Sequence, residues 1–299
     1  MPSVRSTAAP PSDAPVRGVL LMCLAVLMFN TMNVIIKSIY ELYPITQMVW
    51  LRYSFHFLFV VALFAPRLGA LFRTYSLRVQ ALRGVLVVTS AACMFTGIGL
   101  MPLATAVSIT FISPLIVVAL SMAVLGERVT WDRWVAVVCG FVGILVIIRP
   151  GFGGGWAVLL PIGAAVLYAI YQIITRRIAM IENPYASTVY PALCGAIALS
   201  VVQPFEWVTP QPVHWLLFVV CGVLGAAGHF FVIKAYARAQ ANVVAPFIYT
   251  EILGATVWGY LVFHELPDLW TFVGAAIVAA SGIWVVLAER RVQAATRHA

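Results

Sequence analysis

Long apolar stretches alternate with short polar segments along almost the whole chain. A bilayer core of about 30 Å needs about 20 consecutive apolar residues in a helix. The polar breaks predict ten such helices, at residues 17–38, 46–65, 82–101, 104–124, 131–149, 156–177, 185–203, 213–235, 242–262 and 268–288. Connections such as "MPLAT" and "HELPD" leave no room for a soluble domain between them. The pattern therefore predicts an all-α membrane protein.

Composition supports this class. The 299 residues are 63% hydrophobic and 9% charged, with a mean hydropathy of +1.01, whereas a soluble domain carries roughly 25% charged residues. The net charge of +8 is compatible with nucleic-acid binding, but the basic residues sit in short segments between apolar runs, as membrane topology requires. We therefore expect no nucleic-acid partner. Five cysteines fall in five different apolar runs without metal-site spacing, so we expect no metal.

The basic residues also predict the orientation. With the N-terminus in the cytoplasm, the internal segments hold fifteen Lys and Arg residues, the external segments hold Lys37 and Arg149, and Arg52 lies within the second span. The positive-inside rule then favours both termini in the cytoplasm. Residues 1–16 are predicted to be a disordered cytoplasmic tail, and residues 289–299 a second tail. The first apolar run is too long for a signal peptide.

The two halves of the chain contain similar sequence segments in the same order. "LMFNTMNVIIKSIYELYP" aligns with "LYAIYQIITRRIAMIENP" at an offset of 139 residues, and an offset of 138 places Glu127 on Glu265. We expect five helices at 17–149, a glycine-rich joint at 150–155, and five more at 156–288. Because five is odd, the second half enters the membrane in the opposite sense. Such 5+5 inverted-topology repeats are common in secondary transporters, whose substrate site lies between the halves.

The ten spans, "ISPLIVVALSMAVLGERV" at the end of span four and "WLRYSFHFLF" in span two resemble the EamA-type transporters of the drug/metabolite transporter superfamily. The resemblance covers nearly all of residues 17–290. It implies export or uptake of small metabolites, including amino acids, without a covalent cofactor. The second half departs from the family pattern, because "GE" becomes His264–Glu265 and Ile252 replaces the usual proline after the acidic residue.

Polar side chains inside the spans are costly and mark candidate sites. Asn33 and Gln172 occupy equivalent places in the two repeats, and Phe29 and Tyr168 lie four residues earlier on the same helical faces. Spans one and six would then meet around a cavity with amide and aromatic groups, or the amides would be interhelical hydrogen-bond partners. The predicted substrate-binding residues are Asn30, Asn33, Tyr168, Tyr171, Gln172, Tyr249 and Glu251.

Glu251 falls near mid-membrane by its position in span nine. Three interpretations are open: a proton-coupling or substrate-amine site, a helix–helix hydrogen-bonding group, or a partner of Arg52. A lone His229 in span eight is more typical of a packing residue. Pro114 and Pro246 interrupt spans four and nine, and we expect kinks there, which are either hinges or static.

Other function classes are not supported by the sequence. It has no HExxH, GxSxG or paired intramembrane aspartates for an enzyme, and no loop that could hold an ATPase. We expect a carrier of the bacterial inner membrane that exports small, partly hydrophobic metabolites, above all aromatic or other apolar amino acids, by alternating access. Uptake of a vitamin or nucleoside-like metabolite is the alternative, followed by a channel or a lipid flippase. Monomer and homodimer stay open.

Overall fold

The computed structural model describes residues 14–125, 131–149, 155–178, 181–238 and 244–297, and within these ranges the chain is helical without any strand. The first half contains α1 (Ala14–Ser38), α2 (Ile45–Leu63), η1 (Ala65–Arg67), α3 (Leu68–Leu71), α4 (Leu77–Leu100), α5 (Leu103–Thr110), α6 (Ser113–Leu125) and α7 (Trp131–Ile148). The second half contains η2 (Trp156–Val158), α8 (Leu159–Ile178), α9 (Pro184–Ser200), α10 (Gln203–Glu206), α11 (Pro212–Arg238), η3 (Ala245–Tyr249), α13 (Thr250–Phe263) and α14 (Leu269–Arg297).

The helices have the length and composition of membrane spans. Within the described ranges, six are long and apolar enough to cross a bilayer, and four shorter apolar helices lie at Trp134–Ile148, Ala186–Ser200, Phe247–Phe263 and Leu269–Trp284. Together these segments fall at the ten positions that the apolar pattern predicts. Large apolar side chains face outward, including Leu216 (62% exposed) and Leu253 (65% exposed). The chain is a multi-pass membrane protein.

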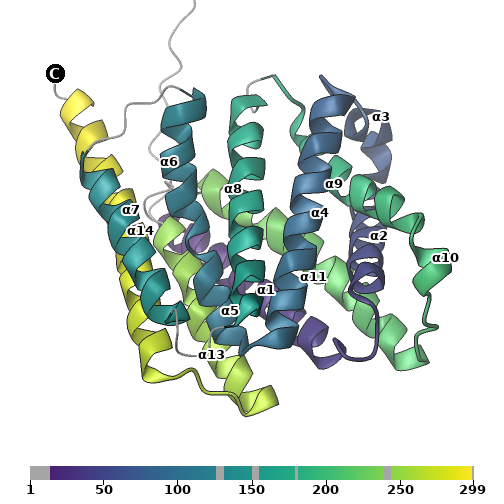
Figure 1. Ribbon diagram of the computed structural model, residues 1–299. Helices are drawn as coiled ribbons and strands as arrows, with labels where there is room; N and C mark the ends of the chain where they lie inside the picture. Colours follow the sequence, from purple (N-terminus) through teal and green to yellow (C-terminus); the bar gives the residue numbers. More distant parts are fainter. Residues whose placement is uncertain (1–13, 126–130, 150–154, 179–180, 239–243, 298–299) are drawn as a thin grey trace, which may run out of the picture.

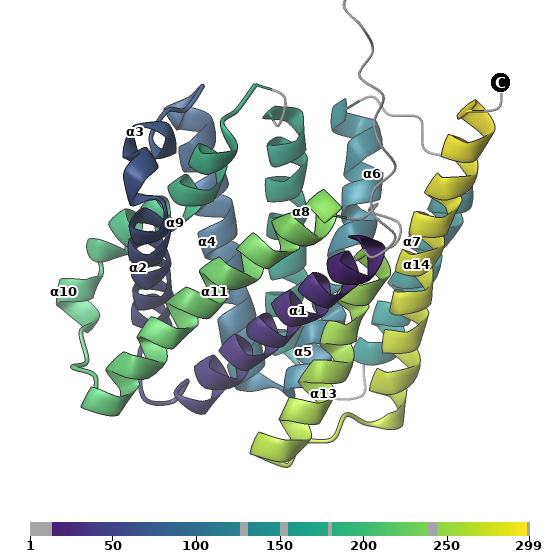
Figure 2. The same cartoon turned by 180° about the vertical axis from the view of Figure 1, so that it is seen from behind.

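Two layers of helices form the bundle. Figure 1 shows α4, α6 and α8 side by side on one face, and Figure 2 shows α1, α11 and α13 on the opposite face. The pair α7 and α14 closes one edge, and α2 and α9 close the other. The main hydrophobic core lies between the layers, around residues such as Ile36, Leu51, Phe95 and Ile109.

Helix contacts in the two halves correspond to each other. The contact of α1 with α11 has its counterpart in α8 with α4, and α2 with α11 matches α9 with α4. Likewise, α1 packs on α13 as α8 packs on α6. Two further pairs, α2–α9 and α7–α14, join equivalent elements of the two halves. This pairing is what a pseudo-two-fold relation between the halves requires.

Glycines allow α11 to approach its neighbours closely. A Cβ added at Gly222 would lie 2.4 Å from the Cβ of Phe55 on α2, and one at Gly228 would lie 2.6 Å from Cε1 of Phe29 on α1. Both separations are too short for real atoms, so only glycine fits there. Gly222 thus allows the close approach of α11 to α2, and Gly228 that of α11 to α1.

The interruption of span four lies just before Pro114. It lies at Phe111 and Ile112, between α5 and α6, where the two N–H groups donate to the carbonyls of Ser108 and Ile109 three residues earlier. Pro114 is the second residue of α6, where a missing N–H costs no helical hydrogen bond. In span nine, Pro246 is the second residue of the 3₁₀ segment Ala245–Tyr249, which precedes α13. Both breaks are thus short 3₁₀ stretches rather than proline kinks within an α-helix.

The predicted tails and joint are only partly described by the structure. Helix α14 continues to Arg297, so the expected tail at 289–299 is helical over its described part. Residues 1–13 of the expected N-terminal tail, 150–154 of the glycine-rich joint, and Glu127 lie outside the described residues.

Candidate functional site

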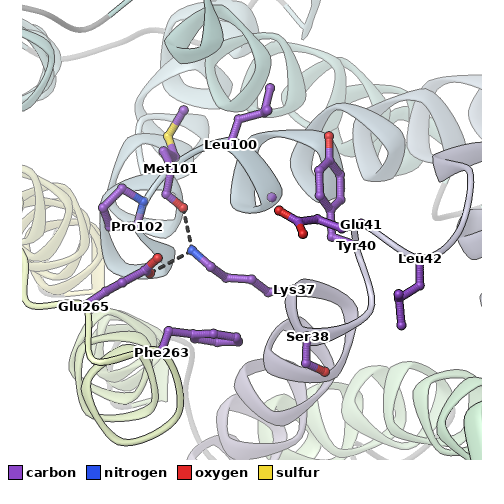
Figure 3. Close-up of a pocket in the computed structure, with 11 residues that line it drawn as sticks. Lys37, Ser38, Tyr40, Glu41, Leu42, Leu100, Met101, Pro102, Phe263 and Glu265 are labelled. Atoms are coloured by element: carbon purple, nitrogen blue, oxygen red, sulfur yellow. Dashed lines mark hydrogen bonds and ion pairs between the residues drawn. The ribbon is translucent and has the colours of Figure 1, made fainter.

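A cavity of about 540 Å³ lies at the end of the bundle where α1, α4 and α13 end and α5 begins. Its lining residues come from both halves of the chain: Lys37, Ser38, Tyr40, Glu41, Leu42, Gly99, Leu100, Met101, Pro102, Phe263 and Glu265. Figure 3 shows Lys37 reaching across it toward Met101 and Glu265, above the ring of Phe263. We call this cavity the vestibule.

Lys37 contacts three other residues that line the vestibule. Its Nζ donates to Oε2 of Glu265 at 2.7 Å and to the carbonyl of Met101 at 2.8 Å, and it lies 5.2 Å from the centroid of the Phe263 ring. The Lys37 side chain is 9% exposed and that of Glu265 is 31% exposed. A partly desolvated ion pair of this kind is screened less than a surface pair. It joins α1 of the first half to the end of α13 in the second.

The local backbone holds Glu265 in place. His264 ends α13 in the left-handed conformation with φ of 55°, and the N–H of Glu265 donates to the carbonyl of Gly259 at 3.1 Å. Oε2 of Glu265 also accepts a hydrogen bond of 3.4 Å from the N–H of Leu103, the first residue of α5. The carboxylate therefore connects three elements. Glycine is the usual residue at such a left-handed helix end, which explains why "GE" is the common family pattern here.

A second polar group is buried where α1, α2, α4 and α11 meet. Arg52 on α2 is 6% exposed. Its guanidinium lies 4.5 Å from the ring centroid of Tyr53 and 5.5 Å from that of Phe95, and its Nε approaches the sulfur of Met32 at 3.3 Å. Its Nη1 is buried without a hydrogen-bond partner.

Two histidines complete this group, which we call the Arg52 cluster. His56 lies one helical turn after Arg52 and is 5% exposed, and neither of its ring nitrogens has a hydrogen-bond partner. Its ring centroid is 6.2 Å from that of His229 on α11, which in turn packs at 5.1 Å against Phe29. No carboxylate within the described residues forms an ion pair with Arg52, so the Arg52–Glu251 pair considered above is absent.

Arg83 on α4 is fully buried but has partners for its nitrogens. Nε donates to Thr175 at 3.0 Å, Nη1 to Gln80 at 2.6 Å and to Ser187 at 3.3 Å, and Nη2 to the hydroxyl of Tyr171 at 3.4 Å. The guanidinium also lies 5.1 Å from the Tyr171 ring centroid. This arginine connects α4, α8 and α9.

The residues predicted on α1 and α13 lie close together. Asn30 is buried, donates from Nδ2 to the carbonyl of Val26 at 3.2 Å, and leaves its Oδ1 without a partner. A Cβ at Gly254 of α13 would lie 2.4 Å from Asn30 Nδ2. Glu251 lies three residues before Gly254, hence on the same side of α13, in its first turn and half-buried. Asn33 is 4% exposed, one turn beyond Asn30.

The residues predicted on α8 form a separate group. The rings of Tyr168 and Tyr171 stack at 5.7 Å, next to Arg83, and Gln172 is half-buried on the same helix. Both α4 and α5 pack against α1 and against α8, so these two helices border a shared region. Tyr249 is elsewhere: it packs at 4.9 Å against Phe111, and a Cβ at Gly282 of α14 would clash with its hydroxyl.

The sequence analysis did not predict two of these groups, the Lys37–Glu265 ion pair and the Arg52 cluster. Lys37 and Glu265 are 228 residues apart, and no local pattern links them. Arg52 and His56 are four residues apart on an otherwise apolar helix, which places both on one face and was the available signal. Among the described residues, no group of three or more His, Cys, Asp or Glu side chains could hold a metal ion.

Comparisons with known proteins agree with this architecture. The model of the EamA-like transporter family matches residues 16–149 and again residues 155–287. A riboflavin transporter of Rhizobium johnstonii is 31% identical over 96% of both chains. An S-adenosylmethionine uptake transporter of Rickettsia prowazekii is 29% identical over 71% of this chain and 73% of its own.

Two further matches are to an exporter and to a solved structure. A pseudopaline exporter of Pseudomonas aeruginosa is 27% identical over 89% of this chain and 94% of its own. One solved crystal structure superposes with a TM-score of 0.65 at 19% identity, over 92% of this chain and 98% of that one. This last match shows a shared fold.

Proposed function

The chain belongs to the EamA-like transporter family, and from that membership we propose a secondary carrier of ten membrane helices in two inverted five-helix repeats, with both termini in the cytoplasm. The corresponding helix contacts of the two halves support the repeat. The excess of basic residues in the internal segments supports the orientation. Because the relatives named above are bacterial transporters, we place it in the bacterial inner membrane.

The Lys37–Glu265 ion pair is the observation that carries the transport mechanism. In the proposed orientation it lies at the outer end, and it joins the two halves across the vestibule. Alternating access needs contacts between the repeats that form in one state and break in the other. An ion pair that is only partly desolvated suits this task, because its net energy is small enough to be reversed during a transport cycle.

The proposed substrate is a small amphipathic metabolite with an unsaturated ring, of the vitamin or nucleoside-like class, taken up into the cell. The stacked rings of Tyr168 and Tyr171 provide an aromatic surface, and Asn30, Asn33 and Gln172 provide amides. The relatives named for riboflavin and for S-adenosylmethionine uptake favour this class.

Amino-acid export is the second candidate. The relative named as a pseudopaline exporter, which matches over most of both chains, supports the export direction of this candidate. In either case Glu251 is proposed as a group at the substrate region that binds and releases a proton during the cycle. For Tyr249 we propose a packing role and no substrate contact, because its side chain lies against Phe111 and against Gly282 of α14.

Transport by purified protein in liposomes tests this proposal. Labelled riboflavin, S-adenosylmethionine, phenylalanine and threonine are offered with and without an imposed pH gradient. We expect saturable entry of at least one ring-containing compound. Entry of none above empty liposomes, from folded protein, would overturn the carrier assignment.

Variants then test the residues. Asn33→Ala and Gln172→Ala should each weaken substrate binding at unchanged yield of folded protein. Thr31→Val is the control on α1, because the Thr31 hydroxyl bonds the Leu27 carbonyl of its own helix. Glu251→Gln should abolish dependence on the pH gradient while leaving substrate exchange intact. Unchanged gradient dependence would refute the proton role.

A further inference from the structure

We propose that Arg52 and His56, with His229 beside them, form a subsite that binds the carboxylate of the transported molecule. The inference rests on the proposed transport function and narrows it, because it assigns the substrate a negatively charged end. The site lies where α1, α2, α4 and α11 meet, and the argument begins with what surrounds the arginine.

The first observation is a buried cation with unused hydrogen-bonding capacity. Arg52 is 6% exposed, no carboxylate within the described residues pairs with it, and its Nη1 has no partner. Among the described residues, its one hydrogen-bond acceptor is the Met32 thioether, which is a weak acceptor. A charged side chain inside a membrane protein normally pairs with another group or lines a functional path. Arg52 therefore lacks the partner that its burial requires.

Two more polar atoms without a hydrogen-bond partner among the described residues lie beside it, on His56. His56 follows Arg52 by four residues, so both side chains project from the same face of α2. Both of its ring nitrogens are buried without partners. Three of the eight unpartnered buried side-chain atoms thus belong to these two residues. Their concentration at one place favours a ligand site over isolated packing defects.

Two aromatic rings and a glycine lie next to the guanidinium. The aromatic rings of Tyr53 and Phe95 lie close to the group, and guanidinium N–H groups point outward in its own plane. Opposite, α11 presents Gly225, whose hypothetical Cβ would come within 3.4 Å of Nη2. Because Gly225 has no side chain, no side-chain atom of this residue covers the nitrogen. His229, one turn further along α11, adds a second imidazole.

Arg83 shows what a structural arginine looks like in the same protein. Each of its three nitrogens donates to a hydroxyl or an amide, from Thr175, Gln80, Ser187 and Tyr171. The fold is thus able to satisfy a buried guanidinium with neutral side chains. It does not do so at Arg52, and this difference argues that the missing partner of Arg52 comes from outside the chain.

The chemistry of the site selects a carboxylate. Guanidinium binds carboxylates through two parallel N–H···O bonds, and an imidazole N–H of His56 is a further donor. We therefore infer a substrate in which a carboxylate accompanies an apolar or ring-containing part, as in aromatic amino acids or a nucleoside linked to an amino acid. A neutral ring compound would leave Arg52 unpaired.

Matched ligand pairs test the subsite. Binding of phenylalanine and phenylalaninamide, and of S-adenosylmethionine and its carboxamide, is measured to purified protein, with neutral riboflavin as a reference. For a bound pair, we expect the carboxylate member to bind about tenfold more tightly or better, as a hydrogen bond to a charged group implies. Arg52→Gln should remove this preference while amide binding changes by less than about twofold.

Two further variants cover the case in which Arg52→Gln does not fold. Arg52→Lys keeps the charge but loses the paired N–H geometry, and His56→Gln keeps the size but loses the imidazole. Each should reduce the carboxylate preference. An unchanged preference in both variants would overturn the subsite, as would wild-type protein that binds each carboxylate and its amide equally, or that binds riboflavin and none of the carboxylates. Failure of the wild-type protein to bind or transport any compound would instead overturn the proposed function.

Discussion

Met32 and Tyr171 occupy equivalent places on α1 and α8, 139 residues apart, and each contacts a buried arginine. Arg52 Nε lies 3.3 Å from the Met32 sulfur, and Arg83 Nη2 lies 3.4 Å from the Tyr171 hydroxyl. The arginines themselves are not equivalent, since one belongs to α2 and the other to α4. Equivalent positions of the two halves thus contact two different arginines, both from the first half. Of these two, only Arg83 has a hydrogen-bond partner for each nitrogen among the described residues.

The hydrogen bonds of Arg83 should contribute to stability. Thr175→Val removes the hydroxyl that accepts from Arg83 Nε at 3.0 Å and leaves a buried donor unpaired. We expect the free energy of unfolding in mixed micelles to fall by about 1.5–3 kcal/mol. Thr96→Val is the control, because the Thr96 hydroxyl bonds the carbonyl of Ala92 in its own helix; it should cost about 1 kcal/mol or less. Equal losses would contradict this role of Arg83.

The Lys37–Glu265 pair should hold the vestibule end closed. Leu103 is fully buried beside Glu265, so a Leu103→Cys reporter, in a background without the native cysteines, should react slowly with an impermeant maleimide. Adding Lys37→Met or Glu265→Gln should speed the reaction about fivefold, for a pair worth roughly 1 kcal/mol.

A second ion pair provides the control for that experiment. Arg149 and Asp268 also join the two halves, but their side chains are 39% and 43% exposed. Arg149→Gln should therefore leave reporter labelling nearly unchanged. If it accelerates labelling as much as Lys37→Met does, the vestibule pair has no special part in closure.

Glycine-to-alanine substitutions should have opposite effects at two helical positions. At Gly222 a Cβ would lie 2.4 Å from the Phe55 Cβ and 2.8 Å from the backbone nitrogen of His56. Gly222→Ala should therefore destabilise the protein by about 1–3 kcal/mol through overpacking. At Gly163 nothing lies within 4 Å of the added Cβ. Gly163→Ala should stabilise α8 by about 0.5–1 kcal/mol. Thermal unfolding of both variants and the wild type in the same detergent measures the two effects. If both substitutions destabilise the protein, the predicted difference between the two glycine positions is wrong.

The sequence predicted the architecture because apolar length is a local property that directly reflects the bilayer. All ten apolar segments were located, and the break in span four, at Phe111 and Ile112, lies in the turn before Pro114. Proline at the second residue of a helix is compatible with helix formation, so its presence marks a helix start as readily as a kink. Local pattern alone does not separate the two.

The site was harder to predict because it depends on contacts between helices. The repeat indicated that Asn33 and Gln172 are equivalent, but equivalence does not require contact, and α4 and α5 pack against both of their helices. Arg52 was assigned a possible partner, Glu251, from similar depth alone. Depth fixes one coordinate of a side chain, whereas its neighbours depend on how each helix is rotated and tilted.

The left-handed helix end before Glu265 should carry strain. His264 has φ of 55°, a conformation that costs a residue with a Cβ roughly 1–2 kcal/mol. His264→Gly should therefore raise the free energy of unfolding by about 1 kcal/mol. The reverse substitution, Gly155→Ala, meets no atom within 4 Å but has φ of 51°, so it should destabilise by about 1–3 kcal/mol. A His264→Gly variant no more stable than the wild type would show that no strain is stored there.

Glu182 should make stability depend on pH. Burial alone would raise the pKa of this carboxyl, but hydrogen bonds from Thr74, Asn183 and Tyr75 outweigh burial and lower the pKa below its ordinary value of 4.5. The charged form is thus favoured by folding. Its contribution is complete above the pKa of the unfolded chain and is lost as the pH falls through the lower pKa of the folded protein.

Glu182→Gln isolates this contribution. The wild type should exceed the variant in free energy of unfolding at about pH 7, and the difference should shrink as the pH falls to about 3. Thr74→Val removes the 2.7 Å hydrogen bond to Oε2, so the pKa of Glu182 should rise and the loss should begin at a higher pH. Because these bonds join the segment before α4 to the turn before α9, parallel pH profiles for wild type and Glu182→Gln would mean that the connection does not depend on the charge.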